Sequence, residues 1–165
     1  MSLWLSAADY AAISMAARLA APAEACGLLV GRRRERSVVE VARVVPAANM
    51  LAGVPGRFEL DPRVRLATEK ALRGTDQAII GHWHSHPGGS VHPSATDAAM
   101  AYEPDLIWLI VAVDGAGRIE AGAYRPVAAG DGFCRLDLRV GREKTCVVPR
   151  SPGAAPSSSV DVTFL

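Results

Sequence analysis

A short pattern of chemically distinctive residues constrains this chain more than any other feature. In order it reads His84-Ser85-His86, then Ser94 and Asp97, or H-x-H-x7-S-x2-D in general form. Two imidazoles and one carboxylate are ligands that a catalytic zinc ion takes, with one coordination position left open. The fold must therefore bring the two histidines and the aspartate around a single ion.

The segments on either side of this pattern fit that requirement. Gln77 to Trp83 predicts a buried strand, Pro87 to Pro93 a loop, and Ser94 to Ala101 a helix. Residues two apart in an extended chain point to one side, so both histidines can reach the same ion. Ser94 and Asp97 also fit a plain helix cap, a hydroxyl followed by an acid at the third position. That alternative is compatible with ligation, because a carboxylate has two oxygens.

Hydrolysis at a zinc site also requires a carboxylate that is not a ligand, to accept and return a proton. Glu24 is the candidate, since it directly precedes a predicted strand at Cys26–Val30 and can be held rigidly there. The other interpretation of Glu24 is an exposed loop residue.

The rest of the chain alternates predicted strands and helices. Ser6 and Asp9 form a capping signature for a helix that ends near Ala21. The remaining predicted elements are strands at Val38–Val45, Phe58–Pro62 (leading into a helix that ends near Leu72), Leu106–Val113, Arg118–Tyr124 and Phe133–Val140. Together they predict an α/β or α+β domain with a mixed sheet and about three helices.

Length and composition are those of an ordinary globular protein. The 165 residues favour one domain, 1–148, followed by a flexible tail, 149–165, that is rich in Pro and Ser. A net charge of +1 gives no reason to expect nucleic acid or an anionic membrane as a partner. Three cysteines make no disulfide framework, and neither a signal peptide nor a membrane span is evident. We therefore expect a cytoplasmic protein.

Four segments carry a family resemblance: Pro22 to Gly31, Phe58 to Pro62, Gly81 to Pro87 and Pro93 to Asp97. They resemble the JAMM metalloprotease motif of the MPN domain family, in its compact prokaryotic form. The resemblance covers roughly Leu3 to Arg125. It implies a single α/β domain with a mixed central sheet, about three helices and a cytidine-deaminase-like layout.

The resemblance also implies a function, that of a zinc isopeptidase. His84, His86 and Asp97 match the zinc ligands, Glu24 matches the general acid and base, and Ser94 matches the hydroxyl that stabilises the oxyanion. Members of the family cut the amide bond after the C-terminal Gly-Gly of ubiquitin-like proteins, and small bacterial members resemble enzymes that act on sulfur carriers. The expected partner is therefore a ubiquitin-like or sulfur-carrier protein with a C-terminal Gly-Gly.

The chain departs from the family pattern at His82, where an aromatic residue is usual, so the packing behind the site is expected to differ. Two alternatives to the protease remain. One is a zinc-containing MPN module that only binds a partner. The other is a zinc deaminase, which requires H-x-E and P-C-x-x-C, and neither occurs here. A homodimer is left open, and no family motif is found after Pro126.

Overall fold

The structure, a computed structural model, describes residues 1–34, 37–127 and 132–141. Its three helices are α1 (Ala7–Ala20), α2 (Pro62–Leu72) and α3 (Ala95–Met100). Its strands are β1 (Ser2–Ser6), β2 (Cys26–Arg33), β3 (Val38–Ala47), β4 (Ala78–Pro87), β5 (Ile107–Val113), β6 (Ile119–Pro126) and β7 (Phe133–Gly141). The predicted tail and the predicted domain boundary at residue 148 lie outside the described residues.

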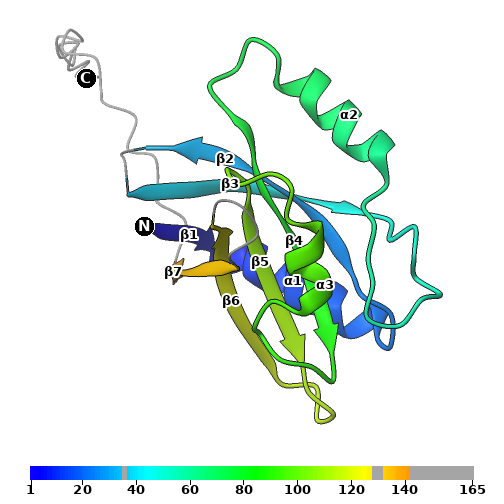
Figure 1. Cartoon of the computed structure of the whole chain (residues 1–165). Helices are drawn as coiled ribbons and strands as arrows, with labels where there is room; N and C mark the ends of the chain where they lie inside the picture. The colour runs from blue at the N-terminus through cyan, green and yellow to red at the C-terminus, as the bar shows by residue number, and fades with distance from the viewer. Residues whose placement is uncertain (35–36, 128–131, 142–165) are drawn as a thin grey trace, which may run out of the picture.

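One mixed sheet organises the molecule (Figure 1). The strand order is β1-β3-β2-β4-β5-β6-β7, and parallel pairing of β1 with β7 closes the sheet into a barrel. At the centre, β4 pairs antiparallel with β2 and parallel with β5. The strand that carries the histidines is therefore held on both edges, which fixes its register and the direction of its side chains.

The main core lies between the sheet and α1. Helix α1 contributes Ile13 and Ala17, which pack with alternate residues of the central strands, among them Leu29, Trp83 and Leu109. A second, smaller cluster on the opposite side of β5 contains Trp108 and Ile110. Because side chains alternate across a strand, each central strand serves both faces. The face opposite α1 is the one that carries His84 and His86, two of the predicted metal ligands.

Gly81 allows β4 and β5 to approach closely. A Cβ atom at this position would lie 2.1 Å from the carbonyl oxygen of Ile107, far inside van der Waals contact. Only glycine fits there without moving one of the two strands. The contact lies one residue before His82, so the close approach helps to set where the following histidines stand.

One sequence prediction requires correction, and two features of the sheet were not predicted. The first strand, Ser2–Ser6, was not predicted, although Leu3 and Leu5 alternate with less buried neighbours. Closure of the sheet was not predicted either, because the β1–β7 pairing joins the two ends of the described chain. The predicted strand Phe58–Pro62 is reduced to one isolated bridge between Asn49 and Leu60. The α/β class with a mixed sheet and three helices is confirmed.

The boundaries of the other elements agree with their predictions within a few residues. The largest difference is in β4, which continues to Pro87 instead of ending at Trp83, so both histidines that were predicted as ligands lie within the strand. Ladder pairing with β5 through Pro87 supports this extension. Among the described residues, no helix combines the length and apolar character needed to cross a membrane.

Candidate active site

Strand β4 presents His82, His84 and His86 on one face of the sheet. Trp83, between the first two, points the other way and is buried in the core against α1. The ring of Phe58 stacks on His84 with the ring centroids 4.3 Å apart. This face therefore carries three imidazoles in a row on a strand that is fixed at both edges. The ring of Phe58 packs against the middle one, His84.

Asp97 completes a compact group with two of these histidines. The Nε2 atoms of His84 and His86 are 2.9 Å apart. Asp97 Oδ1 lies 3.3 Å from His84 Nε2, and Asp97 Oδ2 lies 3.3 Å from His86 Nε2. Four ligands placed tetrahedrally around zinc at 2.0–2.1 Å are separated by about 3.3 Å. The three side chains that were predicted as ligands are thus brought together at spacings that fit one zinc ion.

Helix α3 holds Asp97 in place. Ser94 is its N-cap, and both halves of a capping box are present. The Asp97 amide donates to Ser94 Oγ, while Asp97 Oδ2 accepts from the Ser94 amide at 2.6 Å and from its hydroxyl at 2.8 Å. Both interpretations of this pair therefore apply at once: the aspartate caps the helix through Oδ2 and keeps Oδ1 toward His84.

The second ring nitrogens of the two histidines differ in their surroundings. His86 Nδ1 lies 2.7 Å from the Ser90 carbonyl oxygen, an acceptor, so Nδ1 carries the proton and Nε2 is left for a metal. His84 is fully buried, and its Nδ1 has no hydrogen-bond partner among the described residues. Burial opposes ionisation of Asp97, but the two neighbouring imidazoles, His84 and His86, hold its pKa below its ordinary value.

Glu24 is a buried carboxylate beside this group and not an exposed loop residue. Only 7% of it is exposed. Burial raises the pKa of its carboxyl group, an effect that His86 opposes and Asp97 reinforces electrostatically. Glu24 does not join the three side chains that converge on a possible ion. Its position is compatible with the predicted role of Glu24 as a proton acceptor that is not itself a ligand.

Two residues that the sequence did not single out hold the Glu24 segment. Ser85 is fully buried on β4; its Oγ accepts from the Ala25 amide at 2.8 Å, and its own amide donates to the Ala25 carbonyl. Asn49 Nδ2 donates to the Glu24 carbonyl oxygen at 2.9 Å and to the Arg57 carbonyl. The local sequence offered only a serine between two histidines and an asparagine in a loop, so neither role was visible.

Ser94 lies at the exposed start of α3, next to the metal-ligating group. Its hydroxyl proton is directed at Asp97 Oδ2, and its oxygen accepts the Asp97 amide. A serine hydroxyl rotates freely enough to donate elsewhere when a better acceptor arrives. The predicted catalytic role of Ser94 is thus compatible with its position and is not established by it.

The unusual His82 lies behind the group and is only 8% exposed. Its ring packs against Trp108 with the centroids 4.2 Å apart. Burial, helped by the neighbouring His84, lowers the pKa of His82 to about 3. Its Nε2 atom has no hydrogen-bond partner among the described residues. An imidazole that is both buried and unsatisfied thus takes the place of the usual aromatic ring.

Comparison with known proteins agrees with this geometry. Residues 6–125 match the family model described as prokaryotic homologs of the JAB domain. The desampylase of Haloferax volcanii is 34% identical over 119 residues, which cover 72% of this chain and 79% of that protein. The CysO-cysteine peptidase of Mycobacterium tuberculosis is 32% identical over 106 residues, 64% of this chain and 70% of that protein.

A solved structure of another protein has the same fold. The solution structure of a protein from Desulfitobacterium hafniense superposes with a TM-score of 0.75 at 31% identity, covering 87% of this chain and 94% of that one. The resemblance inferred from the sequence motifs is confirmed, since the family match spans most of the chain. This chain belongs to the prokaryotic JAB family, which is part of the JAB/MPN domain family.

Proposed function

We propose that this protein is a zinc-dependent isopeptidase that hydrolyses the amide bond after the C-terminal Gly-Gly of a ubiquitin-like or sulfur-carrier protein. The observation that carries the proposal is the convergence of His84, His86 and Asp97 beside the buried, non-ligating Glu24. The names of its relatives, a desampylase and a CysO-cysteine peptidase, support the same class of reaction.

His84, His86 and Asp97 would hold the zinc ion. Their ligand atoms all lie within 4.8 Å of one another, and the side chains come from a largely buried strand and a capped helix. When bound, zinc supplies a Lewis acid that polarises the scissile carbonyl and makes water nucleophilic near neutral pH. Three protein ligands leave a coordination position open, as catalytic zinc sites require.

Glu24 would move the proton. It is buried against the ligands, and its raised pKa suits a carboxylate that must first accept a proton from the attacking water and then release it. The proton goes to the amine that leaves when the amide bond breaks. Two hydrogen bonds keep the Glu24 segment in position: the Ala25 amide donates to Ser85 Oγ, and Asn49 Nδ2 donates to the Glu24 carbonyl oxygen.

Ser94 would stabilise the oxyanion. In the unliganded protein its hydroxyl donates to Asp97 Oδ2, which already accepts from the Ser94 amide. Turning the hydroxyl toward the substrate carbonyl would therefore leave Asp97 with one of its two hydrogen bonds from Ser94. A donor aimed at the developing negative charge stabilises the transition state more than the ground state.

The test is cleavage of a defined fusion. A ubiquitin-like protein ending in Gly-Gly is joined through an amide to a reporter, and cleavage is followed by mass spectrometry with and without a chelator. We expect cleavage after the second glycine that stops with the chelator and returns when zinc is added. A protein that binds zinc and the fusion without cutting would instead be the binding module that the sequence left as the alternative. The cytoplasmic location and the homodimer remain predictions.

A further inference from the structure

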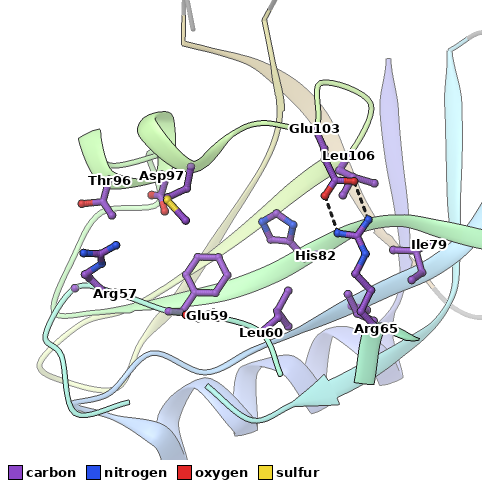
Figure 2. A pocket seen from close by; sticks show the side chains of 14 residues that line it. Arg57, Glu59, Leu60, Arg65, Ile79, His82, Thr96, Asp97, Glu103 and Leu106 are labelled. Carbon is purple, nitrogen blue, oxygen red and sulfur yellow. Dashed lines mark hydrogen bonds and ion pairs between the residues drawn. The ribbon is translucent and has the colours of Figure 1, made fainter. Parts of the chain in front are cut away.

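A cavity of about 230 Å³ lies beside the metal-ligating group (Figure 2). Asp97 and Thr96 line one end, and the loop residues Arg57 to Leu60 form one wall. Asp97 thus belongs both to the metal-ligating group and to this cavity. A substrate bound at the predicted metal position would therefore have part of its chain next to this cavity.

The far end of the cavity is lined by an ion pair. Arg65 on α2 donates to both oxygens of Glu103, at 2.6 and 2.8 Å, and also to Glu69. Figure 2 shows this pair on the opposite side of His82 from Asp97 and Thr96. Because the charges of Arg65 and Glu103 satisfy each other, they create no need for a charged ligand.

The walls between these two ends are mainly apolar, and they contain one unsatisfied polar group. Leu28, Leu60 and Ile79 line the cavity together with His82. The Nε2 atom of His82 is buried and has no hydrogen-bond partner among the described residues. Leaving a buried polar atom unpaired is unfavourable, so a ligand that supplies a partner gains from doing so. The cavity therefore suits a group with an apolar body and one hydrogen-bonding end.

The position of Glu24 indicates which side of the cleaved bond faces the cavity. Strand β2 pairs antiparallel with β4, with Cys26 opposite His84 and Ala25 hydrogen-bonded to Ser85, so the preceding residue Glu24 comes beside His86; neither Glu24 nor His86 lines the cavity. If Glu24 protonates the leaving amine, the amine lies on the His86 side of the metal. The acyl side, which is the Gly-Gly tail, then runs past Asp97 toward the cavity.

We infer that this cavity selects the side chain of a residue that precedes the substrate's glycine pair, and that His82 makes it prefer tyrosine to phenylalanine there. The inference rests on the proposed function. A cavity of about 150 Å³ holds a benzene ring, so the present one accommodates one aromatic side chain. Side chains alternate along an extended tail, so only one of the two residues before the glycines can enter.

The preference has a physical origin at the phenol group. Tyrosine and phenylalanine fill the same apolar space, but only the tyrosine hydroxyl can pair with the His82 imidazole. A site with an unpaired hydrogen-bonding group discriminates against an analogue that lacks the partner. At one of the two positions before the glycines, we expect kcat/KM to be roughly 5- to 100-fold higher for tyrosine than for phenylalanine. At the other position, the two residues should give nearly the same kcat/KM.

The experiment uses diglycine fusions with Leu, Phe or Tyr at each of the two preceding positions. They are assayed with zinc-loaded wild type and with His82→Phe, which restores an aromatic ring and removes the hydrogen-bonding group. His82→Gln retains such a group and guards against a folding defect in His82→Phe. His92→Phe is the matched control, since His92 is exposed and does not line the cavity. Metal content is measured for every variant, because His84 is close by.

The tyrosine preference should disappear in His82→Phe, survive in part in His82→Gln and be unchanged in His92→Phe. Calorimetric binding of Tyr-Gly-Gly and Phe-Gly-Gly tail peptides to zinc-loaded Glu24→Gln gives a measurement that does not depend on turnover. It should show the same preference. Cleavage of all fusions with no difference between Tyr and Phe, or an equal preference in His82→Phe, overturns the inference and leaves the proposed function standing. Absence of both cleavage and peptide binding removes both.

Discussion

The hydroxyl of Ser94 donates to Asp97 Oδ2 at 2.8 Å, while the other carboxylate oxygen of Asp97 lies 3.3 Å from His84 Nε2. One side chain therefore caps a helix and faces the metal-ligating imidazoles. The two hydrogen bonds made by the serine hydroxyl recur at α1, where Ser6 Oγ accepts from the Asp9 amide and donates to its carboxylate. No histidine faces that second pair, which makes it a natural control for the first.

Substituting the two capping serines in turn separates an effect on catalysis from an effect on helix stability. We expect Ser94→Ala to lower kcat/KM about 10²- to 10³-fold in zinc-loaded protein, because an oxyanion donor is lost. Both Ser94→Ala and Ser6→Ala should also lose about 1 kcal/mol of stability with their caps. Urea denaturation and steady-state kinetics on both variants check this. Equal activity of the two variants would reduce Ser94 to a helix cap.

Zinc content tests the ligand assignment. The wild type should bind one zinc ion per chain, and His84→Ala should lose it, because two remaining ligands make a weak site. His92→Ala should keep the ion, since the exposed His92 lies outside the metal-ligating group. Elemental analysis after dialysis at neutral pH measures both. A full complement of zinc in His84→Ala would show that the ion binds elsewhere.

Asn49 is expected to act through the position of Glu24. Its amide nitrogen donates to the Glu24 and Arg57 carbonyls, and its oxygen accepts from the Leu51 and Glu59 amides. Asn49→Ala should lower kcat about 10- to 100-fold with zinc retained, a loss comparable to that of other supporting contacts around metal sites.

Asn49→Asp separates the hydrogen bonds that the Asn49 side chain donates from those that it accepts. It keeps the acceptor for Leu51 and Glu59 but places a carboxylate against two carbonyl oxygens, which it cannot hydrogen-bond when ionised. We expect its kcat to fall at least as far as that of Asn49→Ala. Wild-type kcat in Asn49→Asp would mean that the contact with Glu24 does not matter for catalysis.

The close contact at Gly81 predicts a stability effect. In Gly81→Ala the new methyl group meets the Ile107 carbonyl at 2.1 Å, so strands β4 and β5 must separate. We expect a loss of about 2–3 kcal/mol in the free energy of unfolding. Gly115→Ala is the control, since nothing lies within 4 Å of a Cβ there, and it should change stability by less than about 0.5 kcal/mol. Equal unfolding midpoints would contradict the packing described for Gly81.

Local patterns explain why the convergence of His84, His86 and Asp97 could be predicted. His84 and His86 are two apart on a buried strand, and Asp97 follows a capping serine, so strand alternation and helix capping place all three with no knowledge of distant contacts. The burial of Glu24 was harder to predict, since its segment is held by hydrogen bonds between Ala25 and Ser85 and between Asn49 and the Glu24 carbonyl. Those partners are far away in the sequence and have no periodic signature.

The features that the sequence did not predict depend on contacts between distant segments. Closure of the barrel joins β1 to β7, two strands at opposite ends of the described chain. Strand β1 has only five residues and directly precedes a strong helix cap, so its alternating burial gave a weak signal in the sequence. The cavity beside Asp97 depends on the ion pair between Arg65 and Glu103, which no local rule connects. His82 was noted as an unusual residue, but its unsatisfied nitrogen became visible only in the packed structure.

The most direct test of the central claim is the rate and zinc content of Glu24→Gln on a diglycine-linked fusion. Glutamine has nearly the same shape as glutamate but cannot accept the proton from water. We expect full zinc occupancy with kcat lowered about 10²- to 10⁴-fold, while Glu120→Gln, at an exposed position on β6, keeps wild-type kcat. Glu24→Gln that retains zinc and cleaves the fusion at the wild-type rate would contradict the mechanism.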